Sequence, residues 1–302
     1  MNLLMPNIQT NNTRQVFCST DLDGCIAQTE GSTGFHTVTW NKALISFLED
    51  KLDHQISSNN IELIKNLAKK TYESAAGQAE PIAIKTMLKT LIKILETKNI
   101  DHPINVAADY NFLKNTRIEV AKEYKKKIPE IKNAKKFIEE IDNIGEVGLC
   151  TSSITEIARV ILKRTEMYDL FTTETGSEKI IAADSISLGF DDKSYKGSNS
   201  VTPWEHSISK LFGNKTIDQS KFRMIFAENS IINVVSMLSV FGSRYKNNAR
   251  IIFIGSENQQ QHLATQVSQS NLSDHSHLII PVENFKEASV EIDSFISKEV
   301  TT

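Results

Sequence analysis

The chain has 302 residues, of which 40% are hydrophobic and 24% charged, and its formal net charge is −3. This composition predicts a soluble globular protein with one large domain or two ordinary ones, and it argues against a nucleic-acid partner. The three cysteines, the polar start and the lack of a long apolar run predict a cytoplasmic protein without a membrane partner, with export by an unconventional route left open.

The first expected element is a short apolar strand at residues 16–20, which runs into two acidic residues. Asp21 and Asp23 are spaced by one residue, and Gly24 allows the backbone to turn sharply. Because alternate residues of a strand face the same side, both carboxylates can point into one cleft. Such a pair suits a divalent cation, or a nucleophile beside a general acid, although the same pattern is common in solvated loops.

The next segment is predicted to be helical throughout. Residues 31–34 resemble a hinge, and from about residue 36 to residue 127 apolar side chains recur at helical spacing. The stretch from 82 to 95 is the most strongly amphipathic, with lysines on its polar face.

After Pro129 the pattern changes to strands alternating with helices. Strands are expected at 146–150, 222–227, 250–254 and 277–281, and helices at 131–141, 154–165, 231–241 and 285–297. This alternation predicts a mostly parallel sheet covered on both faces, which binds ligands at the carboxyl ends of its strands.

Polar side chains follow three of the expected strands: Asp21 with Asp23, Thr151 with Ser152, and Glu228 with Asn229. A parallel sheet brings these ends to the same edge, so we expect the six residues to form one site.

At these residues the chain resembles the haloacid dehalogenase superfamily, in the subgroup with a helical (C1-type) cap inserted after the first motif. The segment Asp23-Gly-Cys-Ile-Ala-Gln-Thr-Glu30 parallels the Asp-Gly-Thr-Leu-x-Asp-Ser-Glu run of phosphatases in that subgroup. The resemblance covers residues 16–30 and 128–295. It implies an α/β protein with a Rossmann-like parallel-sheet core at 15–30 plus 128–302, and an all-helical cap at 31–127.

The resemblance also implies a function, namely magnesium-dependent hydrolysis of a small phosphorylated metabolite. Asp21 would attack phosphorus to give an aspartyl-phosphate, and Asp23 would act as general acid and base. In the dehalogenases and ion pumps of the superfamily the position of Asp23 is not acidic, so this residue favours phosphate-ester chemistry.

The remaining site residues have expected supporting roles. Thr151, Ser152 and Gly24 would bind the phosphoryl oxygens, and a lysine would balance their charge, with Lys196 preferred over Lys193. The Mg²⁺ ligands would be Asp21, the carbonyl of Asp23, Glu228 and Asn229.

Two departures from the family pattern leave alternatives open. Relatives usually carry an aspartate at the position of Asn229, and their lysine lies in a Lys-Pro-x-Pro motif that is absent here. An amide brings no charge to the metal, so a catalytically impaired protein that binds a phosphorylated ligand or a protein partner is one alternative. A phosphomutase is the other. The sequence identifies neither the substrate nor the oligomeric state.

Overall fold

The computed structural model describes residues 15–52, 61–185, 202–212, 222–245 and 248–297. The strands in these residues are β1 (Gln15–Thr20), β2 (Gly145–Cys150), β3 (Ile180–Ile181), β4 (Phe222–Glu228), β5 (Ala249–Ile254) and β6 (Ile279–Val282). The helices are α1 (Phe35–Leu52), α2 (Ile61–Glu73), α3 (Glu80–Thr97), α4 (Val106–Glu123), α5 (Ala134–Asp142), α6 (Thr155–Arg164), α7 (Thr202–Phe212), α8 (Ile231–Tyr245), α9 (Glu257–Gln269) and α10 (Phe285–Ser297). Two 3₁₀ segments, Tyr168–Phe171 and Ser273–Leu278, complete the described elements.

The described strands form a six-stranded sheet in the order β3-β2-β1-β4-β5-β6, with every neighbouring pair parallel. The predicted α/β, Rossmann-like parallel sheet is therefore confirmed. β1 lies between β2 and β4, and helices pack on both faces of the sheet there, which explains the almost continuous apolar sequence of β1.

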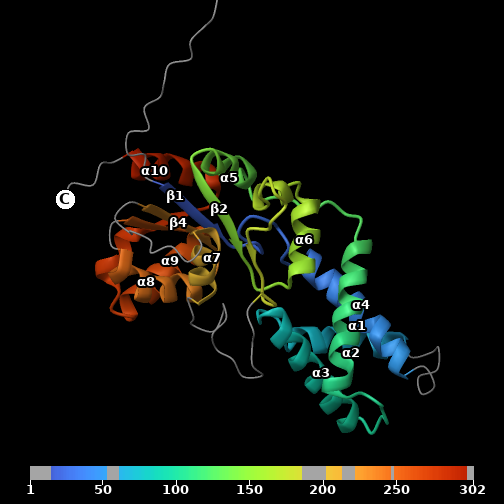
Figure 1. The fold of residues 1–302 in the computed structure, drawn as a ribbon. Helices are drawn as coiled ribbons and strands as arrows, with labels where there is room; N and C mark the ends of the chain where they lie inside the picture. Colours follow the sequence, from blue (N-terminus) through green and yellow to red (C-terminus); the bar gives the residue numbers. More distant parts are fainter. Residues whose placement is uncertain (1–14, 53–60, 186–201, 213–221, 246–247, 298–302) are drawn as a thin grey trace, which may run out of the picture.

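Helices cover the sheet from both sides (Figure 1). Side chains of α5, α6 and α10 pack with Cys18 and the strand residues that point the same way. Side chains of α7, α8 and α9 pack with Phe17 and the strand residues that point to the other face of the sheet. Adjacent residues of β1 thus enter different layers, as the two-residue period of a strand requires.

β1 and β2 approach very closely where they begin. A Cβ on Gly145 would lie 2.2 Å from the backbone oxygen of Val16, so only glycine fits at this position.

The helices α1 to α4 form a group beside the sheet, with a buried apolar cluster of their own (Figure 1). The chain enters this group at Phe35 and leaves it near Tyr124, and these two rings pack edge to face with centroids 5.2 Å apart. This packing is in line with the division into a core and a helical cap at residues 31–127, which stays a proposal. None of the helices in the described residues combines the length and apolarity that a membrane crossing requires.

Candidate active site at the strand ends

The ends of β1, β2 and β4 lie side by side, as the sequence pattern predicts. In the register of the sheet, Thr20 at the end of β1 pairs with Leu149 on one side and Ala227 on the other. The backbone N–H of Asp21 continues the pairing by donating to the oxygen of Ala227 at 2.8 Å. Asp21, which is buried, therefore lies level with the ends of both neighbouring strands.

A tight turn follows Asp21 and positions Asp23. The N–H of Ile26 donates to the oxygen of Leu22, and the N–H of Gly24 donates to the oxygen of Ala27. Gly24 has a φ of +72°, which side-chain-bearing residues rarely adopt. The glycine of the motif is thus required by the backbone conformation of the turn.

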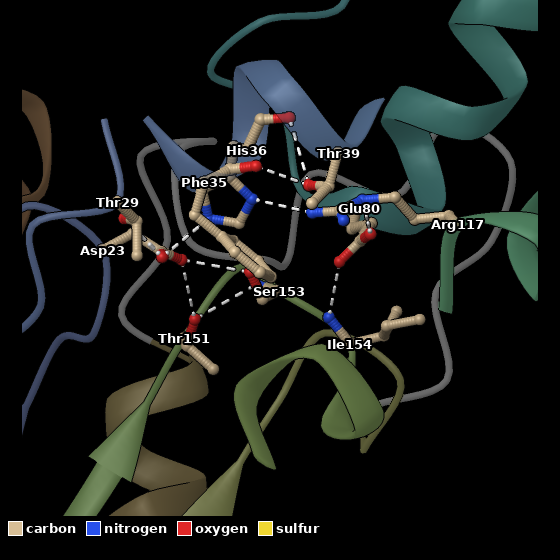
Figure 2. A network of polar contacts seen from close by, with 10 residues as sticks. All are labelled: Asp23, Thr29, Phe35, His36, Thr39, Glu80, Arg117, Thr151, Ser153 and Ile154. Atoms are coloured by element: carbon tan, nitrogen blue, oxygen red, sulfur yellow. Dashed lines mark hydrogen bonds and ion pairs between the residues drawn. The ribbon is translucent and has the colours of Figure 1, made fainter. Parts of the chain in front are cut away.

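Both oxygens of the Asp23 carboxylate accept hydrogen bonds (Figure 2). Oδ1 lies 2.8 Å from the Thr29 hydroxyl and 2.7 Å from Nε2 of His36. Oδ2 lies 3.0 Å from the Ser153 hydroxyl and 3.5 Å from the hydroxyl of Thr151. The network therefore joins the loop after β1, the start of α1 and the loop after β2.

This network favours the ionised form of Asp23. Burial alone would raise the pKa of Asp23, but hydrogen bonds from His36, Thr29 and Ser153 lower it below its ordinary value. Arg117 Nη2 lies 3.1 Å from Nδ1 of His36, and a guanidinium can only donate. Nδ1 therefore accepts, and Nε2 carries the proton that is donated to Asp23.

The network continues from His36 into a buried ion pair within the helical group. Arg117 of α4 is fully buried, and its Nε lies 3.6 Å from Oε1 of Glu80, at the start of α3. The other oxygen of Glu80 accepts from the N–H of Ile154 at 3.0 Å, and the N–H of Glu80 donates to the oxygen of Ser152 at 2.9 Å. The start of α3 is thus attached directly to the loop after β2.

Glu228 has a contact pattern that the sequence does not predict. Its side chain is fully buried. Oε1 accepts from the N–H groups of Asn229 and Ser230 at 3.0 Å, and Oε2 accepts from Nδ2 of Asn233 at 3.1 Å. The Glu228 carboxylate therefore caps the N-terminus of α8, where the helix dipole favours a negative charge.

Asn229 lies over the turn of the first motif. A Cβ added to Gly24 would be 2.3 Å from Nδ2 of Asn229 and 3.0 Å from a carboxylate oxygen of Glu30. The amide of Asn229 is therefore next to the residue that follows Asp23.

The oxygen donors at this edge fit Mg²⁺ in kind, because Mg²⁺ prefers carboxylate, amide and carbonyl oxygens. The predicted donors are Asp21, the carbonyl of Asp23, Glu228 and Asn229. The described part of the chain gathers no group of three or more His, Cys, Asp or Glu side chains that could hold a metal. A magnesium ion here would keep water molecules in its shell, as is usual for this ion.

Several residues of this site are not among those that the sequence predicts. The missed residues are Thr29, His36, Glu80, Arg117 and Ser153. Thr29 lies in the segment that resembles the phosphatase motif, and Ser153 follows Ser152 directly, so both could be predicted from local sequence. Glu80 and Arg117 carry no local signal. Lys193 and Lys196 lie outside the described residues.

A cavity of about 280 Å³ lies between the strand ends and the helical group. Asp23, Ser152 and Ser153 contribute from the core side, and residues of α1, α2 and α3 form the opposite wall, among them Trp40 and Tyr72. The cavity thus adjoins the carboxylate of Asp23 and has room for a small molecule.

We expect Gly24→Ala to destabilise the fold and disturb this site. The positive φ alone costs about 1–3 kcal/mol, and the new Cβ also displaces the Asn229 amide. Gly176→Ala is the matched control, because Gly176 has a φ of +81° with open space around its Cβ position. Urea unfolding of both variants separates the two effects: Gly24→Ala should be the less stable, and equal losses would show that the Asn229 contact is unimportant.

No family model matches the chain, and no curated protein resembles it in sequence. The solved structures similar to it include the magnesium-bound HAD hydrolase YfnB of Bacillus subtilis, with 10% identity, a TM-score of 0.48, and 93% of this chain and 99% of that one covered. CbbY of Rhodobacter sphaeroides in complex with phosphate shares 11% identity with a TM-score of 0.46, covering 80% and 86%. The β-phosphoglucomutase of Clostridium difficile shares 14% identity with a TM-score of 0.49, covering 94% and 99%.

The parallel sheet, the helical insertion after β1 and the polar ends of β1, β2 and β4 agree with the arrangement that the resemblance to the haloacid dehalogenase superfamily implies. The parallel sheet that the resemblance implies is confirmed, and membership of the superfamily stays a prediction.

Proposed function

We propose that this chain hydrolyses small phosphomonoesters in a magnesium-dependent reaction through an aspartyl-phosphate on Asp21. The observation that carries the proposal is the position of Asp23. Its carboxylate is two residues from Asp21, borders the cavity, and is oriented by four side chains. A nucleophile with an oriented acid–base group beside it is the arrangement that covalent phosphoryl transfer needs.

In the first step, a carboxylate oxygen of Asp21 attacks phosphorus and the bond to the ester oxygen breaks. Asp23 is ionised in the free site, and the negative charge of the bound ester raises its pKa, so that Asp23 takes up a proton from solvent as the ester binds. Asp23 then gives this proton to the ester oxygen, and the alcohol leaves. In the second step, water attacks phosphorus, Asp23 takes its proton, and the bond to Asp21 breaks to release phosphate. Thr151 and the backbone N–H groups of the following loop would bind the phosphoryl oxygens. Bound Mg²⁺ supplies positive charge against the anionic ester, with Asp21, the carbonyl of Asp23, Glu228 and Asn229 as its proposed ligands.

The test is release of phosphate from an aryl phosphate, with and without Mg²⁺, by the wild type and by Asp21→Asn. We expect turnover that needs Mg²⁺ and that falls by about 10⁴-fold or more in the variant, because the nucleophile is lost. Equal rates for the two proteins would contradict the assignment of Asp21.

One observation favours a second candidate, a protein that keeps the fold to bind a phosphorylated ligand with weak or no catalysis. The Glu228 carboxylate accepts three hydrogen bonds from its own helix terminus, and Asn229 brings no negative charge. The hydrogen bonds engage the Glu228 oxygens that a metal ion would bind, and the amide of Asn229 adds no negative charge, so both features weaken metal binding.

Asn229→Asp distinguishes the two candidates. If charge at the metal site is limiting, the aspartate should lower the Mg²⁺ concentration needed for half-maximal activity by about tenfold, with Asn229→Ser as the uncharged control. A wild type and an Asn229→Asp variant that are both silent while binding a phosphorylated ligand would favour the binding protein.

A further inference from the structure

The cavity beside Asp23 has an unusual charge for a site that receives an anionic ester. Its wall includes the carboxylates of Asp23, Glu30 and Glu80, and among the described residues that line it there is no lysine or arginine. The nearby Arg117 is fully buried and forms an ion pair with Glu80, so these two charges balance each other and the negative charge of the wall comes from Asp23 and Glu30.

The side of the cavity away from the strand ends is made of small, apolar and aromatic groups. Ala75, Ala83 and Met87 line it together with Trp40 and Tyr72. This wall is where the alcohol part of an ester would lie if its phosphoryl group sits at the strand ends beside Thr151. A second phosphate or a carboxylate there would lose its hydration and meet no described cation, which is costly. An ammonium group there would contact the rings of Trp40 and Tyr72 and be attracted, across the small cavity, by the carboxylates of Asp23 and Glu30.

We infer that the ester bound here has a small alcohol part without negative charge, and that an amine is its best-suited substituent. The inference rests on the proposed function and adds the substrate class to it. The cavity volume of about 280 Å³ fits an alcohol of a few carbon atoms.

The experiment compares three two-carbon esters that differ in the charge at the far end: phosphoethanolamine, ethyl phosphate and phosphoglycolate. The full-length chain is assayed for phosphate release with Mg²⁺, beside an aryl phosphate and with Asp21→Asn as the blank. We expect kcat/KM for phosphoglycolate to be lower than that for phosphoethanolamine by about tenfold or more, with ethyl phosphate between them.

A variant that adds a positive charge to the cavity wall tests whether charge causes the preference among the three esters. Ala76 is exposed and lies on the cavity wall, in the turn between α2 and α3, so that a longer side chain is tolerated. Ala76→Lys should raise kcat/KM for phosphoglycolate and lower it for phosphoethanolamine, whereas the neutral Ala76→Gln should keep the wild-type order.

The outcomes separate this inference from the proposed function. Turnover of the aryl phosphate that depends on Asp21, combined with a preference for phosphoglycolate or with no shift in Ala76→Lys, overturns the substrate class alone. Absence of Asp21-dependent turnover with every ester overturns the proposed function, and the substrate class with it.

Discussion

Asp23→Asn should lower kcat for an alkyl phosphate by about 10²–10⁴-fold while leaving the fold intact, because the variant loses proton transfer but little else. Asparagine has nearly the shape of aspartate. Its oxygen can accept from Thr29 and His36, and its amide can donate to the hydroxyls of Ser153 and Thr151, which accept as well as donate.

The leaving group makes this prediction diagnostic. A nitrophenolate leaves without a proton, whereas an alkoxide needs one, so Asp23→Asn should slow an alkyl phosphate far more than a nitrophenyl phosphate. Ser153→Ala is the control, since it removes one hydrogen bond to Asp23 but keeps the carboxylate. Equal losses with both esters would show that Asp23 does not protonate the leaving oxygen.

Arg117→Met should destabilise the protein by about 3–5 kcal/mol, because it leaves Glu80 buried without a counter-charge. The loss includes the stacking of the guanidinium over the rings of Phe35 and Trp40, with Cζ at 5.1 and 4.9 Å from their centroids. Urea unfolding at neutral pH measures the effect.

A double variant identifies Glu80 as the origin of the loss. Within the described residues, Glu80 Oε1 and Arg117 Nε lack hydrogen-bond partners, so the pair is imperfect. Arg117→Met with Glu80→Gln should therefore recover most of the stability, and failure to recover would assign the loss to packing.

The pH dependence of Arg117→Met gives the same information. Burial raises the pKa of Glu80, and the charge of Arg117 opposes that rise, so the pKa climbs further once Arg117 is gone. A carboxyl whose pKa is raised by folding stabilises the fold below its unfolded pKa and loses this contribution as pH rises. The deficit of Arg117→Met relative to the double variant should therefore shrink as pH falls toward about 4, near the ordinary glutamate pKa.

The sequence predicts the sheet well because its central strands are apolar and end in motifs. It misses β3, which has two residues, and it misses α9, which buries only Leu263 and Val267 and so has almost no apolar face. The last expected strand, 277–281, begins late because residues 273–278 form a 3₁₀ segment.

The candidate site is predictable only where its residues follow strands. Asp21, Asp23 and Thr151 belong to the local pattern, and the parallel sheet brings their positions to one edge. The packing of three helices connects Asp23 to His36, Arg117 and Glu80. His36 and Arg117 are 81 residues apart in the sequence, and no local pattern encodes such contacts. Glu228 shows a different limit. An acid between a strand and a helix can bind a metal or cap the helix, and the sequence does not distinguish these uses.

The most direct test of the central claim is to trap the covalent intermediate. The wild type is mixed with Mg²⁺ and an ester, quenched in acid during turnover, digested and examined by mass spectrometry. The account predicts a peptide that contains Asp21 and carries the added mass of one phosphoryl group, and borohydride should reduce that acyl phosphate at Asp21 and no other residue. Turnover without a phosphorylated peptide, or with the phosphoryl group on another residue, would contradict it.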